Sequence, residues 1–166
     1  MPSVLFVCTA NRFRSPLASA FFQNELRNTA ASAPWIVDSA GTWTSRGLPV
    51  LPEVALIARR YDLDLTSHRS KPVSRKLLEA QHLILVMEAG QQEALHSEFP
   101  ALRRRVHLLS QVAEGRAYDI PDWTDAPDSV LKISETLRDI IQKGFLNICR
   151  LALHLQGGAQ TEHKQP

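Results

Sequence analysis

The sequence predicts an α/β fold: a single domain with a central four-stranded parallel sheet and helices on both faces. Short β-rich runs alternate with segments of helical periodicity, which is typical of strand–helix–strand crossovers. The run at 83–86 is continuously apolar, as expected of a strand covered on both faces. A chain of 166 residues can bury one core of its own. We expect the domain to span 1–156 and a disordered tail to span 157–166.

The first half of the chain is expected to hold two strands and two helices. A β-rich run at 4–7 predicts the first strand. Ser15 is expected to cap the following helix and Pro16 to occupy its first turn. A second strand is expected over 35–37, and an alanine-rich helix over 52–61.

The second half alternates in the same way. We expect helices over 74–80, 91–99 and 129–155, and strands over 82–87 and 106–109. Ser74 is expected to cap the first of these helices, and Gly157-Gly158 to end the last. Between the last strand and the last helix, 110–127 is the longest irregular stretch of the chain. Loops of such length are often functional.

Composition excludes several classes of function. With 19 basic and 17 acidic side chains, the charge is too even for a protein whose main task is to coat nucleic acid or an anionic membrane. No apolar run approaches the ~20 residues that cross a bilayer, and no secretory leader is evident, so we expect a cytoplasmic protein. The six histidines lack ligand spacing, so we expect neither a metal site nor a cofactor.

The loop after the first strand carries the chemistry. Five residues separate Cys8 from Arg14, and a helix follows at once. A strand–loop–helix turn can direct backbone N–H groups inward, and a helix N-terminus attracts anions. Arg14 adds a fork that binds two phosphate oxygens, and the same positive potential favours the nucleophilic thiolate of Cys8. The alternative is a buried cysteine at a strand end and an arginine at the surface.

At these residues the sequence resembles the low-molecular-weight protein tyrosine phosphatase family, whose signature is a strand followed by Cys-x-Gly-Asn-x-Cys-Arg-Ser-Pro. Further similar blocks lie in the same order at 38–42, 65–70, 83–87 and 119–122, so the resemblance covers about 4–150. It implies a cysteine-dependent phosphomonoester hydrolase, most often a protein tyrosine phosphatase. The substrate would be a phosphotyrosine protein or a small aryl phosphate.

The resemblance assigns three catalytic residues. Cys8 would be the nucleophile that forms a cysteinyl phosphate, and Arg14 would bind the phosphoryl group. The general acid would be an aspartate in the late loop. Ile-Pro-Asp in relatives points to Asp122, with Asp125 as the alternative, whereas Asp128 is expected to cap or precede the last helix.

The other site residues follow from the same resemblance. Relatives keep a hydrogen-bonded network that shapes the loop and supports the thiolate, and its positions here are Asn11, Ser15, Ser39 and His68. The remaining loop residues are expected to bind substrate: Thr9, Ala10, Arg12 and Phe13. Trp43 and Trp123 are expected to form aromatic walls around the substrate ring, although Trp43 could equally be a core residue.

The loop departs from the family pattern at two positions. Ala10 replaces a glycine, which would strain the backbone if that position needs a positive φ. Phe13 replaces a second cysteine, so this protein should lack the disulfide that protects the nucleophile in relatives. Phosphoarginine-specific relatives have a small threonine at the position of Arg12, and the arginine side chain is much bulkier. The charge of Arg12 would favour substrates with acidic residues beside the phosphorylated one.

Two other functions remain open from the sequence. An arsenate reductase would need further cysteines, and Cys149 is better explained as a buried thiol in the long helix. A non-catalytic phosphopeptide-binding module is compatible with Ala10, Phe13 and Trp123. The retained Cys8, Arg14 and Asp122 weigh against it. We expect a monomer or a weak dimer.

Overall fold

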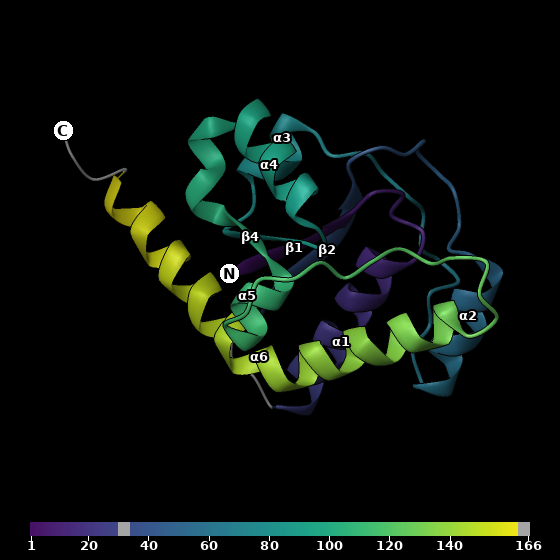
Figure 1. The fold of residues 1–166 in the computed structure, drawn as a ribbon. Coiled ribbons are helices and arrows are strands. Elements are labelled where there is room, and N and C mark those ends of the chain that lie inside the picture. Colours follow the sequence, from purple (N-terminus) through teal and green to yellow (C-terminus); the bar gives the residue numbers. More distant parts are fainter. Residues whose placement is uncertain (30–33, 163–166) are drawn as a thin grey trace.

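A four-stranded parallel sheet lies at the centre of the structure, between two layers of helices (Figure 1). The computed structural model describes residues 1–29 and 34–162. The strands are β1 (Ser3–Cys8), β2 (Ile36–Gly41), β3 (Leu83–Val86) and β4 (Val106–Leu108). Their order is β2-β1-β3-β4, and every neighbouring pair is parallel. The predicted fold class is therefore confirmed.

The two faces of the sheet have separate apolar cores, because successive strand residues point to opposite sides. Val4 and Phe6 of β1 lie in the larger core, whereas Leu5 and Val7 lie in the smaller one. The larger core is covered by α1 (Arg14–Asn28), α2 (Pro52–Arg60), α5 (Leu109–Glu114) and α6 (Ser129–Glu162). The smaller is covered by α3 (Arg75–Glu79), α4 (Ala89–Glu98) and the 3-10 helix η1 (Pro100–Arg105).

Most elements lie where the sequence predicts them, and the differences have local causes. β2 runs beyond 35–37 because Asp38 and Ser39, which are common in turns, pair here with Leu5 and Phe6 of β1. The helices α5 and η1 were not expected. Each spans only six residues, too few for helical periodicity to be visible in the sequence. The irregular stretch shortens to residues 115–128, which we call the aspartate loop.

The two predicted serine caps have different outcomes. Ser74 is confirmed, because its hydroxyl accepts the N–H of Leu77 at 3.2 Å at the start of α3. The prediction for Ser15 is wrong. Helix α1 begins at Arg14 with Phe13 as N-cap and no side-chain cap, and the Ser15 hydroxyl is directed to the sulfur of Cys8.

Helix α6 is longer than expected, and its end projects beyond the sheet (Figure 1). It continues through Gly157 and Gly158 to Glu162, so the predicted end at these glycines is wrong. Two glycines lower helix propensity by about 1 kcal/mol each, which does not by itself end a long helix. The remainder of the predicted tail, 163–166, lies outside the described residues, and the domain boundary at 156 stays a prediction.

Gly144 lies within α6 at a close contact with α5 and does not break the helix. A Cβ at this position would lie 2.5 Å from the Cα of Ala113 in α5. Gly144 therefore lets α5 and α6 approach closely. No helix within the described residues is long and apolar enough to cross a membrane.

Candidate active site

The Cys8 loop, residues 8–14, lies at the carboxyl end of β1, the inner strand flanked by β2 and β3. Ligands of parallel α/β sheets bind at this edge. Cys8 and Arg14, at the two ends of the loop, are only 2% and 1% exposed. Both are thus held by protein groups, whose geometry decides what the loop can do.

The sulfur of Cys8 is held by two polar groups. The backbone N–H of Asn11 donates to Sγ at 3.3 Å, and the Ser15 hydroxyl lies 3.0 Å from Sγ. Ser15 Oγ also accepts a hydrogen bond from Asn11 Nδ2 at 2.9 Å. A hydroxyl has one proton to donate, and a thiolate can only accept. The site can therefore direct two donors at an ionised sulfur.

Asn11 is the centre of the network behind the loop. Its Nδ2 also donates to Ser39 Oγ at 2.9 Å, and its Oδ1 accepts the backbone N–H of Lys71 at 3.0 Å. Its φ is 54°, in the left-handed region. Ala10 is not among the described residues with positive φ, so the strain considered at that position does not arise. Asparagine tolerates this conformation better than most residues.

His68 supports the same residue from outside the loop. Its Nε2 lies 2.8 Å from the carbonyl oxygen of Asn11, and because a carbonyl only accepts, Nε2 carries the proton. Burial lowers the pKa of His68, and the hydrogen bond to Asn11 opposes this shift. The neutral imidazole with its proton on Nε2 is therefore favoured at neutral pH.

The backbone of the Cys8 loop is fixed against β2. A Cβ on Gly41 would lie 2.5 Å from the carbonyl oxygen of Thr9, so the contact needs glycine. The N–H groups of Thr42 and Trp43 donate to the carbonyls of Cys8 and Thr9 at 2.9 and 3.0 Å. The loop is thus held from outside by its carbonyls. Within the described residues, the N–H groups of five loop residues donate no hydrogen bond: Thr9, Ala10, Arg12, Phe13 and Arg14.

Arg14 is a buried charge between two carboxylates. Its Nη1 donates to Glu88 and, at 2.8 Å, to the carbonyl of Ile120, and its Nη2 donates to Asp122 Oδ2 at 2.8 Å. A buried charge needs such partners. Its Nε is one of two buried polar side-chain atoms among the described residues with no hydrogen-bond partner; the other is Oε1 of Gln81.

The aspartate loop brings one acid to this arginine. Asp122 contacts Arg14, is 43% exposed, and accepts the N–H of Trp123 at 3.0 Å. Asp119 instead accepts the N–H of Ala89 at 2.8 Å, and Asp125 makes no ion pair within the described residues. Of the aspartates considered from the sequence, Asp122 is the one at the Cys8 loop. Asp128 directly precedes α6, as expected.

Comparisons with known proteins identify the family. The family model for the low molecular weight phosphotyrosine protein phosphatase matches residues 3–149. The chain belongs to this family.

Relatives of this chain are named as tyrosine phosphatases or as arginine phosphatases. A probable low molecular weight protein-tyrosine-phosphatase EpsP of Ralstonia nicotianae is 29% identical over 120 residues, covering 72% of this chain and 77% of the relative. A protein-arginine-phosphatase of Bacillus subtilis is 30% identical over 121 residues, covering 72% and 77%. Among solved structures, the YwlE arginine phosphatase of Geobacillus stearothermophilus has a TM-score of 0.77 at 26% identity, covering 100% of this chain and 99% of that one. The chain is a phosphatase of the low molecular weight family.

The side chains expected to bind substrate in this phosphatase fall into two groups. Trp43 is 84% exposed, so the alternative of a core residue is wrong, and Trp123 is 46% exposed. Arg12 donates through Nε to the carbonyl of Pro49 at 2.8 Å. Phe13 is only 3% exposed and packs in the larger core, so its side chain is not available to a substrate. Any contact of Phe13 with a substrate would therefore be made by its backbone N–H, and its assignment to substrate binding stays a prediction.

The structure adds residues that the sequence reasoning missed. Glu88 pairs with Arg14, Lys71 supports Asn11, and Gln91 donates through Nε2 to Thr9 Oγ1 at 3.1 Å. Glu88 follows β3 by two residues, at the edge where sites of parallel sheets lie, and this position was a usable signal.

The second cysteine of the phosphatase lies outside the site. Cys149 lies in α6 and is half-buried, and burial raises the pKa of its thiol to about 11. Both cysteines are free. A thiol that stays protonated at neutral pH is a poor nucleophile, so Cys149 is better explained by packing.

Proposed function

We propose that this phosphatase hydrolyses phosphotyrosine in proteins, with Cys8 as nucleophile, Arg14 as phosphate ligand and Asp122 as general acid. One observation carries the proposal. Arg14, buried at the end of the Cys8 loop, keeps an Nε–H donor without an acceptor. A phosphoryl oxygen would be that acceptor, and the free N–H groups of the loop would bind the others. Thr9 and Ala10 would contribute to phosphate binding through their backbone N–H groups.

The first chemical step forms a phosphorus–sulfur bond. The Cys8 thiolate attacks phosphorus as the bond from phosphorus to the phenolic oxygen breaks. Protonated Asp122 gives its proton to that oxygen, so the leaving group departs as a neutral phenol. Because Asp122 contacts Arg14 in the free protein, the phosphoryl group must take over Nη2, which places the acid beside the leaving oxygen.

The second step releases inorganic phosphate. A water oxygen attacks phosphorus, the phosphorus–sulfur bond breaks, and its electron pair returns to Cys8 as the thiolate. The water proton goes to Asp122, which is restored for the next turnover. Ser15 and the N–H of Asn11 stabilise the departing thiolate.

Exposed aromatic residues favour phosphotyrosine over phosphoarginine. Trp43 and Trp123 offer flat apolar surface to a phenyl ring. Arg12 places a cation in the loop itself, and its charge repels the guanidinium that forms when phosphoarginine is hydrolysed. Arginine phosphatases among the relatives nevertheless make phosphoarginine the second candidate. The cytoplasmic location, the lack of nucleic-acid binding and the monomer or weak dimer also stay predictions.

The mechanism is tested with p-nitrophenyl phosphate. The wild type should hydrolyse it, Cys8→Ser should show no activity above background, and Asp122→Asn should lose ~10²-fold or more in kcat. Asp125→Asn is the matched control and should retain its activity. Turnover by Cys8→Ser would contradict the cysteine mechanism, and a crippled Asp125→Asn beside an active Asp122→Asn would identify Asp125 as the acid.

Phosphotyrosine and phosphoarginine peptides of one sequence decide the substrate class. We expect kcat/KM to be higher on the phosphotyrosine peptide. A preference for the phosphoarginine peptide would contradict the assignment of substrate while leaving the cysteine mechanism intact.

A further inference from the structure

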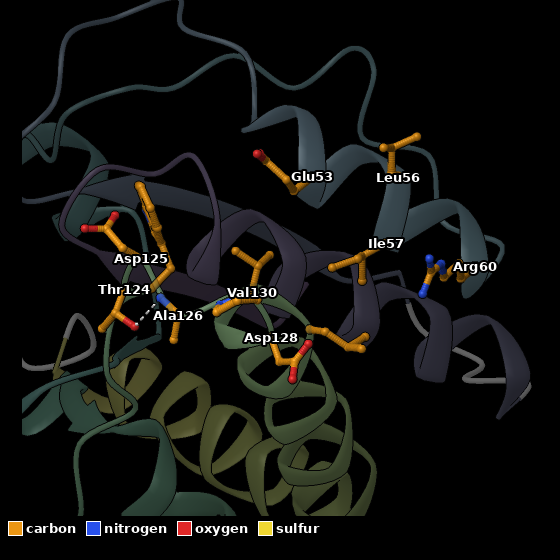
Figure 2. Close-up of a pocket in the computed structure, with 12 residues that line it drawn as sticks. Glu53, Leu56, Ile57, Arg60, Thr124, Asp125, Ala126, Asp128 and Val130 are labelled. Carbon is orange, nitrogen blue, oxygen red and sulfur yellow. Dashed lines mark hydrogen bonds between the residues drawn. The ribbon is translucent and has the colours of Figure 1, made fainter.

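A groove separates α2 from the aspartate loop and the first turn of α6. Its volume is about 500 Å³, which is in the range of ligand sites. Glu53, Leu56 and Arg60 line it from α2, and Asp125 and Asp128 line it from the other side (Figure 2). None of these five residues belongs to the Cys8 loop, and the groove meets the candidate active site at Trp123, which lines both.

Apolar surface is exposed on both sides of the groove. Leu56 is 61% exposed and Trp123, which also lines the groove, is 46% exposed. Ile57 and Val130 also line the groove and are less accessible. An exposed apolar pair around a hollow is suited to bind an apolar side chain.

The charge of the groove is negative. Its carboxylates are Glu53, Asp125 and Asp128, and Arg60 is its cation. Within the described residues, none of the four is in an ion pair. The excess of two carboxylates is unneutralised and would attract a basic side chain.

Both walls of the groove are attached to the Cys8 loop. Leu51, immediately before α2, donates its N–H to the carbonyl of Arg12 at 3.0 Å. On the other side, the carbonyl of Ile120 and the carboxylate of Asp122 accept hydrogen bonds from Arg14. The groove therefore begins where the active site ends, and Trp123 follows Asp122 directly. α2, with nine residues, is about 14 Å long, the length of about four extended residues.

We propose that this groove binds the polypeptide that flanks the phosphorylated residue of the substrate. The preferred substrates carry a large apolar side chain and a lysine or arginine, both within about four residues of the phosphorylated residue. The apolar side chain packs on Leu56 and Trp123, and the basic side chain faces Glu53, Asp125 and Asp128. The inference rests on the proposed phosphatase function and names the class of protein that it acts on.

The test compares two phosphotyrosine peptides of equal length. One carries leucine and lysine on both sides of the phosphotyrosine, and the other carries alanine and glutamate at the same positions. Placing the flanks on both sides makes the test independent of chain direction. p-Nitrophenyl phosphate has no residues that flank its phosphoryl group, so its hydrolysis reports on the active site alone.

Two variants remove one property of the groove each, and each has a matched control. Leu56→Ser removes exposed apolar surface, and Leu146→Ser does the same at a leucine that is 63% exposed in α6. Glu53→Gln removes a groove charge, and Glu135→Gln removes an exposed charge from α6. All four variants should hydrolyse p-nitrophenyl phosphate as the wild type does.

We expect the wild type to prefer the leucine–lysine peptide by about tenfold in kcat/KM. Leu56→Ser should lose most of this preference, and Glu53→Gln should reduce it about threefold at low salt. The two controls should keep it. Equal rates on both peptides, or a preference for the acidic peptide caused by Arg12, would overturn the inference. So would a groove variant that behaves like its control.

A binding measurement keeps this test separate from the proposed chemistry. Phosphonate analogues of both peptides cannot be hydrolysed, and their Kd is measured by fluorescence anisotropy with the same variants. If p-nitrophenyl phosphate is not hydrolysed, the proposed mechanism fails, and the ratio of the two Kd values still decides the inference. The same tenfold ratio supports the groove, and a ratio of one overturns it.

Discussion

Replacing Asn11 by alanine should show how much the network behind the Cys8 loop contributes to stability. The variant loses the side-chain hydrogen bonds to Ser15 and Ser39 and from the Lys71 N–H. At a net ~1 kcal/mol each, these bonds contribute about 3 kcal/mol. Alanine also tolerates the φ of 54° less well than asparagine, which adds about 1 kcal/mol. We expect Asn11→Ala to lower the free energy of unfolding by about 3–4 kcal/mol.

Urea denaturation measures this loss, and two further variants divide it. Asn11→Gly has the same missing hydrogen bonds without the conformational strain, so it should be about 0.5–1 kcal/mol more stable than Asn11→Ala. Asn24→Ala, which removes an exposed contact to Arg27, should change stability by less than about 0.5 kcal/mol. A loss below about 1 kcal/mol for Asn11→Ala would refute the reasoning, because the buried Ser15 and Ser39 hydroxyls would then have found other partners.

Three further predictions concern the surroundings of the site. Glu88→Gln should lower the free energy of unfolding by about 1–2 kcal/mol in urea, because Arg14 loses one of two charged partners; an unchanged midpoint would contradict this. Gly144→Ala should lower the Tm because its Cβ meets Ala113, whereas Gly157→Ala, which meets nothing within 4 Å, should raise it; equal shifts would contradict the close contact. Stability should fall as the pH drops below 6.5, because the unfolded chain protonates His68 before the folded one does; His68→Gln should flatten this slope in part, and an unchanged slope would be evidence against it.

The fold was predictable because its signals are local. The buried strands β1 and β3 are short apolar runs, and the long α6 repeats its apolar residues every three or four positions. Elements of one or two turns carry too few residues for such a pattern, so α5 and η1 were missed. The predicted helix end at Gly157 and Gly158 was wrong because a glycine ends a helix only where its backbone leaves the helical conformation.

The site divides in the same way. Cys8, Arg14 and Asn11 lie within one loop, and their spacing could be read from the chain. The sheet and distant segments bring Glu88 and Lys71 to the loop, so their roles become visible only in the three-dimensional structure. Ser15 could not be assigned from the sequence, because a serine near the start of a helix can cap the helix or form a hydrogen bond with a nearby sulfur.

The contacts of Arg14 also bear on how the chain folds. Its hydrogen bonds to Ile120 and Asp122 join residues 106 and 108 positions apart, and β1 pairs with strands on both sides, one of them β3. Contacts of such sequence separation close large loops and form slowly, since the entropy of closure comes before any stabilisation. On refolding, catalytic activity should therefore recover later than the helical circular dichroism signal. The rate at which activity returns would then measure the last step of folding.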